Sequence, residues 1–205
     1  MLLPDRDKAD LGTKAQRKWA RQEGLEVSSD CWETINHLNL SVLRGANWHR
    51  MIFFSKWLLY RTPQALSRMG TGYPDMCFHC KEVGVAGWIH VIVTCRCIQG
   101  YWEGIFAMLT TMAQVSISPR IWLMSLGYDP EARLSSRWEK LVFIATAVAR
   151  SLLLRNWWSE LSPTSQEWRC KMTQVRVQEM RYASRVGSAI KFSQIWGDYF
   201  IEKPG

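Results

Sequence analysis

The sequence predicts an all-α protein, a helical domain with one Cys-Cys-His-Cys zinc-binding turn inserted between its helices. Apolar residues recur every three or four positions through most of the chain, which places them on one face of a helix. Metal-binding side chains also gather between two such segments, at Cys77, Cys80, His90 and Cys95. No internal repeat or low-complexity tract interrupts this pattern.

The first 30 residues are polar and mixed in charge. Gly12 and Gly24 lie on either side of the basic run from Lys14 to Arg21 and limit any helix there. Such a composition is typical of chain ends that do not pack, so we expect residues 1–30 to be a flexible lead-in. The helical domain should then occupy residues 31–205. Asp30 is placed to cap a short first helix over residues 31–38.

The next helix is expected over residues 46–60, where apolar side chains share one face and Lys56 lies on the other. Thr62 and Pro63 predict the start of a further short helix, with Thr62 as N-cap and Pro63 at the first helical position. Gly70, Gly72 and Pro74 then connect this helix to the cysteine cluster.

After the cluster, residues 99–112 predict a helix with one apolar stripe, made by Trp102, Ile105, Phe106, Leu109 and Met112. Residues 121–126 are apolar and are compatible with a strand or a helix. Residues 127–130 should form a turn, because Gly127 begins them and Pro130 ends them.

Two long helices are expected to follow, over residues 136–158 and 164–186, and to pack antiparallel through Trp168, Met172 and Leu152. Thr164 and Glu167 have the spacing of a capping box at the start of the second helix. Arg150 falls on the expected wet side of the first helix or at its margin. A last helix should dock through Phe192, Trp196 and Phe200, which are four residues apart.

The metal-ligand set spans residues 77–95 with the spacing Cys-x2-Cys-x9-His-x4-Cys. Three thiolates and one imidazole suit zinc, and four protein ligands leave no open position, so a structural role is expected. Two alternative ligands stay open: His79 lies between the first two cysteines, and Cys97 follows Cys95 closely. A thioredoxin-like redox site would need a βαβ setting, and a zinc deaminase would need an upstream His-x-Glu; neither is present.

Composition limits the compartment and the class of partner. The formal charge is +8 with a pI near 9.4, which favours a polyanionic partner. The longest apolar stretch, residues 141–149, is too short to cross a bilayer, and no signal peptide follows Met1. We therefore expect a reducing compartment, cytoplasmic or nuclear, and no membrane partner.

Several short motifs together resemble a known family. They are Leu58-Leu59-Tyr60-Arg61-Thr62-Pro63, Tyr73-Pro74-Asp75-Met76-Cys77-Phe78-His79-Cys80, the His90–Cys95 segment, Leu126-Gly127, Ala147-Val148-Ala149-Arg150, Asn156-Trp157, Pro163, Trp168 and the run from Met180 to Trp196. Over residues 30–200 the chain resembles the carboxy-terminal cysteine-rich region of LINE-type non-LTR retrotransposon polyproteins. The resemblance implies a segment that binds the RNA of the element, beside a reverse transcriptase and an endonuclease elsewhere in the polyprotein.

Catalysis is not expected from this chain. A reverse transcriptase needs an Asp-Asp turn to hold magnesium, and the sequence has no Asp-Asp pair. The expected partner is RNA or single-stranded DNA, together with other parts of a retrotransposon polyprotein. The expected phosphate contacts form one stripe on the last long helix and flank the zinc turn; they are Arg169, Lys171, Arg176, Arg181 and Arg185, with Lys81 and Arg96 and, further out, Lys56, Arg61 and Arg68. Phe78 and Trp88 are candidates for base stacking or for packing over the zinc.

The alternative function, from a different class, is a structural or protein-interaction domain. In that interpretation the zinc holds helices together and the basic face is incidental, because most charged faces are simply solvated.

Overall fold

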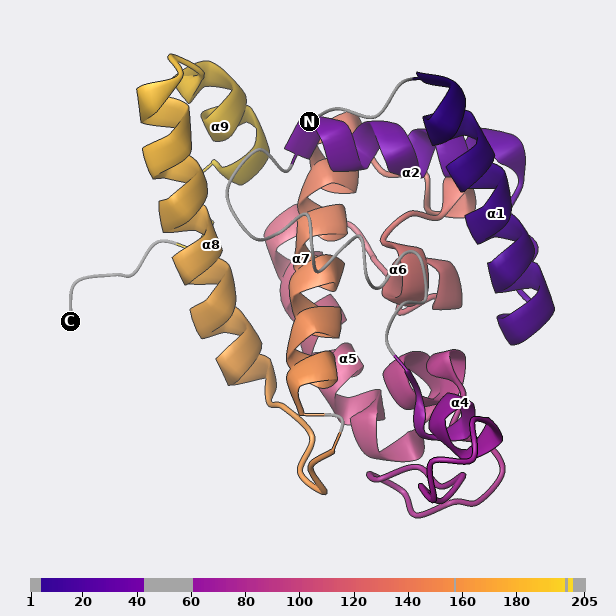
Figure 1. Ribbon diagram of the computed structural model, residues 1–205. Coiled ribbons are helices and arrows are strands. Elements are labelled where there is room, and N and C mark those ends of the chain that lie inside the picture. Colours follow the sequence, from indigo (N-terminus) through magenta and orange to yellow (C-terminus); the bar gives the residue numbers. More distant parts are fainter. Residues whose placement is uncertain (1–4, 43–60, 157, 198, 201–205) are drawn as a thin grey trace.

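The computed structural model describes residues 5–42, 61–156, 158–197 and 199–200, and the all-α prediction is confirmed (Figure 1). The helices are α1 (Asp5–Glu23), α2 (Ser29–Val42), α4 (Pro63–Arg68), α5 (Gln99–Ala113), α6 (Ile121–Leu126), α7 (Ser136–Arg155), α8 (Ser165–Arg185) and α9 (Ala189–Trp196). Short turns of π- or 3-10 helix are η1 (His90–Thr94), η2 (Arg96–Ile98) and η3 (Pro130–Ala132). The described residues contain one isolated antiparallel bridge, between Met76 and Val83, and they form no β-strand beyond it.

Helix α7 is the centre of the fold, and α2, α5, α6, α8 and α9 all contact it (Figure 1). Every residue from 141 to 150 on α7 is buried. A helix that is apolar on all sides must be covered on all sides, which explains why five other helices surround it. None of the helices described is both long enough and apolar enough to cross a bilayer.

Helices α7 and α8 pack side by side and run antiparallel, as predicted (Figure 1). The capping box is confirmed, since the Thr164 side chain accepts from the Glu167 N–H while the Glu167 carboxylate accepts from the Thr164 N–H. The buried indole of Trp168 donates to the carbonyl of Ala145 at 2.9 Å, which fixes α8 against the middle of α7. Helix α7 ends at Arg155, three residues before the predicted end.

The prediction that Arg150 lies on the solvent-facing side of its helix, or at the margin of that side, is wrong. Its side chain is 2% exposed, and its Nη1 donates to the carbonyl of Met124 at 3.0 Å. Helix α6 covers this side of α7, which the periodicity of α7 alone does not reveal. Burial lowers the pKa of Arg150 to about 9, so the guanidinium remains charged at neutral pH.

Residues 121–126, which the sequence left open between strand and helix, form helix α6. Gly127 ends α6 with a φ of 80°. A Cβ at Gly127 would lie 2.8 Å from Cδ2 of Phe143, so both the turn and the close approach to α7 require glycine.

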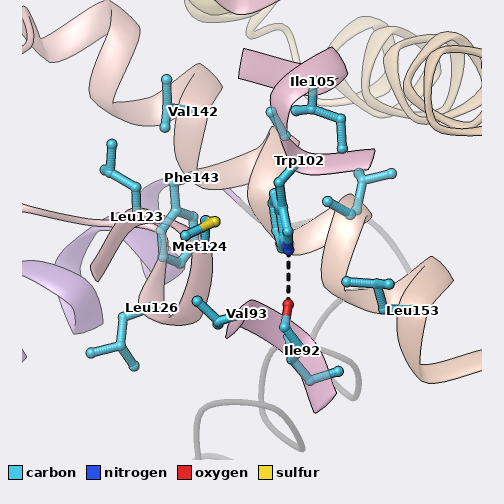
Figure 2. Close-up of a cluster of buried hydrophobic side chains, with 14 of the residues drawn as sticks. Ile92, Val93, Trp102, Ile105, Leu123, Met124, Leu126, Val142, Phe143 and Leu153 are labelled. Atoms are coloured by element: carbon cyan, nitrogen blue, oxygen red, sulfur yellow. Dashed lines mark hydrogen bonds between the residues drawn. The ribbon is translucent and has the colours of Figure 1, made fainter. Parts of the chain in front are cut away.

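Helix α5 packs the apolar stripe that the sequence predicted, with Met112 half-buried at its end. Figure 2 shows Trp102 of this helix among side chains from α6 and α7, with its indole directed at the backbone of Ile92. The hydrogen bond from Trp102 Nε1 to the Ile92 carbonyl is 2.8 Å long. The central core is therefore joined directly to the segment that carries His90 and Cys95.

The predicted flexible lead-in over residues 1–30 differs from the structure. Helix α1 continues through Gly12, and its Ala15 and Trp19 are buried. Trp19 packs edge-on against Trp88, with ring centroids 6.4 Å apart. The apolar side chains of α1 are few, so the sequence resembles an unpacked end until the tertiary partner, Trp88, is known.

Two other predictions concern the segment before the cysteines. The predicted helix over residues 46–60, with Lys56, lies outside the described residues. The start of α4 is confirmed, because the Thr62 side chain accepts from the Ala65 N–H and Pro63 occupies the first turn.

Candidate metal centre

A tight loop presents Cys77 and Cys80. The N–H of Lys81 donates to the Cys77 carbonyl at 2.8 Å, and the N–H of Cys77 donates to the Glu82 carbonyl at 2.9 Å. Lys81 has a φ of 62°, the left-handed conformation that ends such a turn. This backbone path turns both sulfur atoms toward the same point.

The other two ligands come from a π-helical turn. The N–H of Cys95 donates to the His90 carbonyl at 2.8 Å, which closes the wide turn η1. In an α-helix, residues five apart point about 140° away from each other, because each residue advances about 100°. The wider π-turn instead brings His90 and Cys95 to the same side, and such turns often occur at functional sites.

The four ligand atoms lie within 4.8 Å of one another, and no ion is present in the structure. Sγ of Cys77 and Sγ of Cys95 are 3.8 Å apart, and Sγ of Cys80 lies 3.3 Å from Nε2 of His90. Zinc–sulfur and zinc–nitrogen bonds of about 2.3 and 2.0 Å at tetrahedral angles would place two sulfurs about 3.8 Å apart and a sulfur and a nitrogen about 3.5 Å apart. The cluster therefore has the size of a tetrahedral metal site and can hold a metal ion.

The electrostatics of the cluster separate the pKa values of its three thiols. A hydrogen bond shared between Cys77 and Cys95 lowers the pKa of Cys77 and raises that of Cys95, so one proton leaves well before the other. The backbone N–H groups of Cys80 and His79 lower the pKa of Cys77 further. Burial raises the pKa of Cys80. A divalent cation would offset that burial, because it binds the deprotonated sulfurs.

The two alternative ligands do not join the cluster. The His79 ring is buried and lies outside the group of four. Cys97 is exposed and its Sγ donates to the His79 carbonyl at 3.5 Å. The structure thus gathers the four ligands that the spacing predicted.

Helix α1 packs against the segment that leads to the candidate metal centre. The Glu23 carboxylate accepts from the Ile89 N–H at 2.9 Å, and so holds the start of the segment that leads to His90. Trp88, just before Ile89, is only 1% exposed and packs against Trp19 of α1. Of the two stacking candidates, Trp88 is therefore a packing residue.

Phe78, the second candidate, belongs to an aromatic surface beside the metal centre. Its ring centroid lies 4.8 Å from that of Trp158, and Trp158 lies 5.2 Å from Tyr73. Trp158 is 43% exposed and Tyr73 is 46% exposed. We call these three residues the aromatic surface. Sequence reasoning missed Tyr73 and Trp158, although both flank predicted elements.

The loop that carries Trp158 is attached to the metal-binding segment. Lys81 and Glu160 form an ion pair of 2.6 Å, and the Ser162 hydroxyl donates to the Cys97 carbonyl at 3.0 Å. Lys81, a predicted phosphate contact, is therefore paired, whereas Arg96 is exposed on η2. Both lie next to the metal ligands, as expected from their positions in the chain.

The five basic residues of α8 do not form a single stripe. At about 100° per residue, Arg169 and Arg176 share one flank, Lys171 lies on the other, and Arg181 and Arg185 point outward. Arg176 is half-buried: its guanidinium lies 5.4 Å from the Phe192 ring centroid, and its Nη2 donates to the Gly197 carbonyl at 3.5 Å. Arg176 thus joins α8 to the end of α9.

Lys171 lies near Arg155, which was not among the phosphate contacts predicted from the sequence. Burial and then the nearby charge of Arg155 lower the pKa of Lys171. Arg155 is exposed at the end of α7, three residues before Trp158. Two close cations therefore lie at the same end of the helix pair as the aromatic surface.

Comparisons with known proteins do not extend this picture: no protein-family model matches the chain, and no curated protein matches it.

Proposed function

We propose that this chain is a non-catalytic, zinc-stabilised domain that binds RNA or single-stranded DNA. The aromatic surface of Tyr73, Phe78 and Trp158 carries the proposal. A small metal centre needs a cover, but large aromatic rings that remain nearly half exposed do more than cover it. Bases of single strands stack on such rings whatever their sequence, whereas duplexes do not offer them.

Zinc is the metal we assign. Three cysteines and one histidine with ligand atoms within 4.8 Å of one another favour zinc over the oxygen-binding cations. Four protein ligands leave no position for a reacting water, so the proposed role of the metal is to hold the turn and the π-helical segment together. This assignment agrees with a binding function and requires no chemistry at the metal.

Charge near the aromatic surface supports an anionic partner. Arg155 and Lys171 are close enough to repel one another, and a bridging phosphate would relieve that repulsion. Lys81 follows Phe78 of the aromatic surface by three residues. Its exposed ion pair with Glu160 is weak enough to open for a phosphate. The net charge of +8 acts in the same direction over the whole molecule.

The biological setting we propose is a LINE-type retrotransposon polyprotein or a remnant of one, on the strength of the motif resemblance. In that setting the domain would bind the RNA of the element and present it to a reverse transcriptase. Its partners would be RNA or single-stranded DNA and other parts of the polyprotein.

The experiment measures binding of the zinc-loaded protein to a labelled single-stranded RNA by fluorescence anisotropy. Tyr73→Ala and Trp158→Ala should each weaken binding by about 5- to 150-fold, because one stacked base contributes about 1–3 kcal/mol. Leu161→Ala is the matched control, since Leu161 is 79% exposed on the same loop but is not aromatic. Zinc content and thermal unfolding of each variant report whether the metal centre is intact.

If both aromatic variants keep their zinc and bind RNA as tightly as the parent, the proposal is wrong. The structural or protein-interaction alternative would then be preferred, and the aromatic surface would be a contact for another protein.

A further inference from the structure

A pocket of about 650 Å³ lies between α7, α8 and α9, at the end of α8 remote from Trp158. Its volume is in the range of small-molecule sites. Aromatic side chains contribute to its wall: Tyr182 from α8, with Phe192 and Trp196 from α9. The rings of Phe192 and Trp196 are nearly parallel, with an interplanar angle of 27°. Trp196 is 1% exposed and the two ring centroids are 6.3 Å apart, so the rings pack on each other and give the pocket an aromatic lining against which a flat ring can lie.

A carboxyl group lines the same pocket. Glu179 is partly buried, and its Oε1 is buried without a hydrogen-bond partner among the described residues. A buried carboxylate oxygen without a donor is unfavourable, and rotation about the last side-chain bond can turn either oxygen toward the pocket. Burial raises the pKa of Glu179 to about 7, and N–H donors from a ligand would stabilise its charged form.

Cationic side chains border the pocket. Arg137 and Lys140 come from the first turns of α7 and Lys191 from α9, and Arg137 and Lys191 are exposed. Three cations disfavour a positively charged ligand. The pocket therefore fits a ligand with a flat ring, hydrogen-bond donors on that ring and an anionic group at the solvent side.

We propose that this pocket binds a guanine nucleotide, with the Watson–Crick edge of the base on Glu179 and the phosphate at Lys140 and Lys191. Guanine presents two adjacent donors, N1–H and the 2-amino group, which match the two oxygens of one carboxylate. Adenine and cytosine present a single amino donor on that edge beside ring acceptors, and Glu179 in its ionised form, which predominates above pH 7, cannot donate to those acceptors.

The nucleotide can come from an unpaired position in a strand or from solution. The strand source rests on the proposed function, whereas the chemistry of the pocket does not. A base splayed out of a single strand is read in this manner, by hydrogen bonds on its Watson–Crick edge and by aromatic walls.

The first test is calorimetric titration of the zinc-loaded protein with GMP, IMP and AMP. IMP lacks the 2-amino group, so it should bind at least about tenfold more weakly than GMP, since it makes one hydrogen bond fewer to a charged group. Glu179→Gln should remove that difference, because an amide offers one acceptor and one donor. Glu103→Gln removes the same charge at an exposed position on α5, and it should keep the tenfold preference for GMP over IMP.

The proposal is overturned if the parent fails to bind GMP, if it binds GMP and IMP equally, or if Glu179→Gln keeps the tenfold preference. Thermal unfolding of Glu179→Gln checks that the variant is folded. A second variant, Lys191→Gln, leaves Glu179 in place and should reduce the preference for GMP over guanosine, which lacks the phosphate.

The second test separates the two sources. An oligouridylate with one central guanosine should bind more tightly than oligouridylate alone, and Glu179→Gln should cancel the gain. If neither oligonucleotide binds while GMP does, the proposed function fails and the pocket serves free nucleotides. If both bind equally in the parent and GMP shows no preference over IMP, the pocket proposal fails and the proposed function stands.

Discussion

The indole N–H of Trp102 donates to the carbonyl of Ile92 at 2.8 Å, and Ile92 lies in the chain between two candidate metal ligands, His90 and Cys95 (Figure 2). Trp102 is fully buried among residues from α6 and α7. The central core and the candidate metal centre are therefore linked through one side chain, so that changes in packing should alter metal affinity.

The first prediction concerns this link. Trp102→Phe keeps an aromatic ring but leaves the Ile92 carbonyl without its donor, which should cost about 1–3 kcal/mol of unfolding free energy. It should also weaken zinc binding, measured by competition with a chelator. Trp168→Phe is the matched control, because it removes an equivalent bond to the Ala145 carbonyl, which lies on α7 and outside residues 77–95. Equal zinc affinity in the two variants would show that the hydrogen bond between Trp102 and Ile92 does not couple core packing to zinc binding.

The second prediction concerns the metal. Protein purified under reducing conditions should contain one zinc per chain by elemental analysis, and Cys80→Ser should release it. Cys170→Ser should keep it, because Cys170 is exposed and lies outside the cluster. Chelation should increase hydrogen exchange in residues 77–95 more than in α7, since metal binding and local folding are coupled. Protein without zinc would refute the assignment.

The third prediction concerns Arg150. Arg150→Ala removes the donor to the Met124 carbonyl and opens a cavity, so it should destabilise the protein by about 2–4 kcal/mol. Arg150→Met fills the same space and removes a buried charge, so its destabilisation should be smaller by at least about 1 kcal/mol. Denaturant unfolding of both variants measures the difference. Equal destabilisation would mean that the hydrogen bond outweighs the burial of the charge.

The fourth prediction concerns pH. The pKa of Glu179 is raised from 4.5 to about 7 in the folded state. Between these values the unfolded chain releases the proton first, so this group lowers stability as pH rises from 4.5 to 7 and has a constant effect above that. Glu179→Gln should therefore match the parent in melting temperature near pH 4 and exceed it at pH 8. A gain that does not change with pH would contradict the raised pKa.

The fifth prediction concerns the basic residues. Arg155→Gln with Lys171→Gln should weaken RNA binding and reduce the slope of log affinity against log salt, by about 0.7 for each phosphate that is no longer neutralised. Arg181→Gln with Arg185→Gln removes the same charge from the outer side of α8 and should have a smaller effect. Arg176 is left unchanged because it packs on Phe192. Equal salt slopes in the two double variants would mean that only net charge matters.

Local sequence was enough for several features. Thr164 and Glu167 predicted the start of α8, and Thr62 with Pro63 predicted the start of α4, because a cap involves residues only three positions apart. The four residues of the candidate metal centre were also predicted, since their spacing is a property of a short segment. The nucleic-acid function stays a prediction, as does the family resemblance.

Features that join distant segments were beyond the sequence. Residues 73, 78 and 158 form one aromatic surface only because the loop after α7 folds onto the metal-binding segment. The pocket at Glu179 needs α7, α8 and α9 together. Neither arrangement leaves a periodic pattern in the chain.

By itself the sequence determined the helical class, the starts of α4 and α8 and the candidate ligand set, because each depends on hydrogen bonds and periodicity within a few residues. The tertiary structure decided that α1 is docked through Trp19, that Arg150 is buried and that η1 is a π-turn. The physical reason is that burial depends on which faces meet. A helix with few apolar residues can still be covered, and a charged residue on a long helix can still face a neighbour.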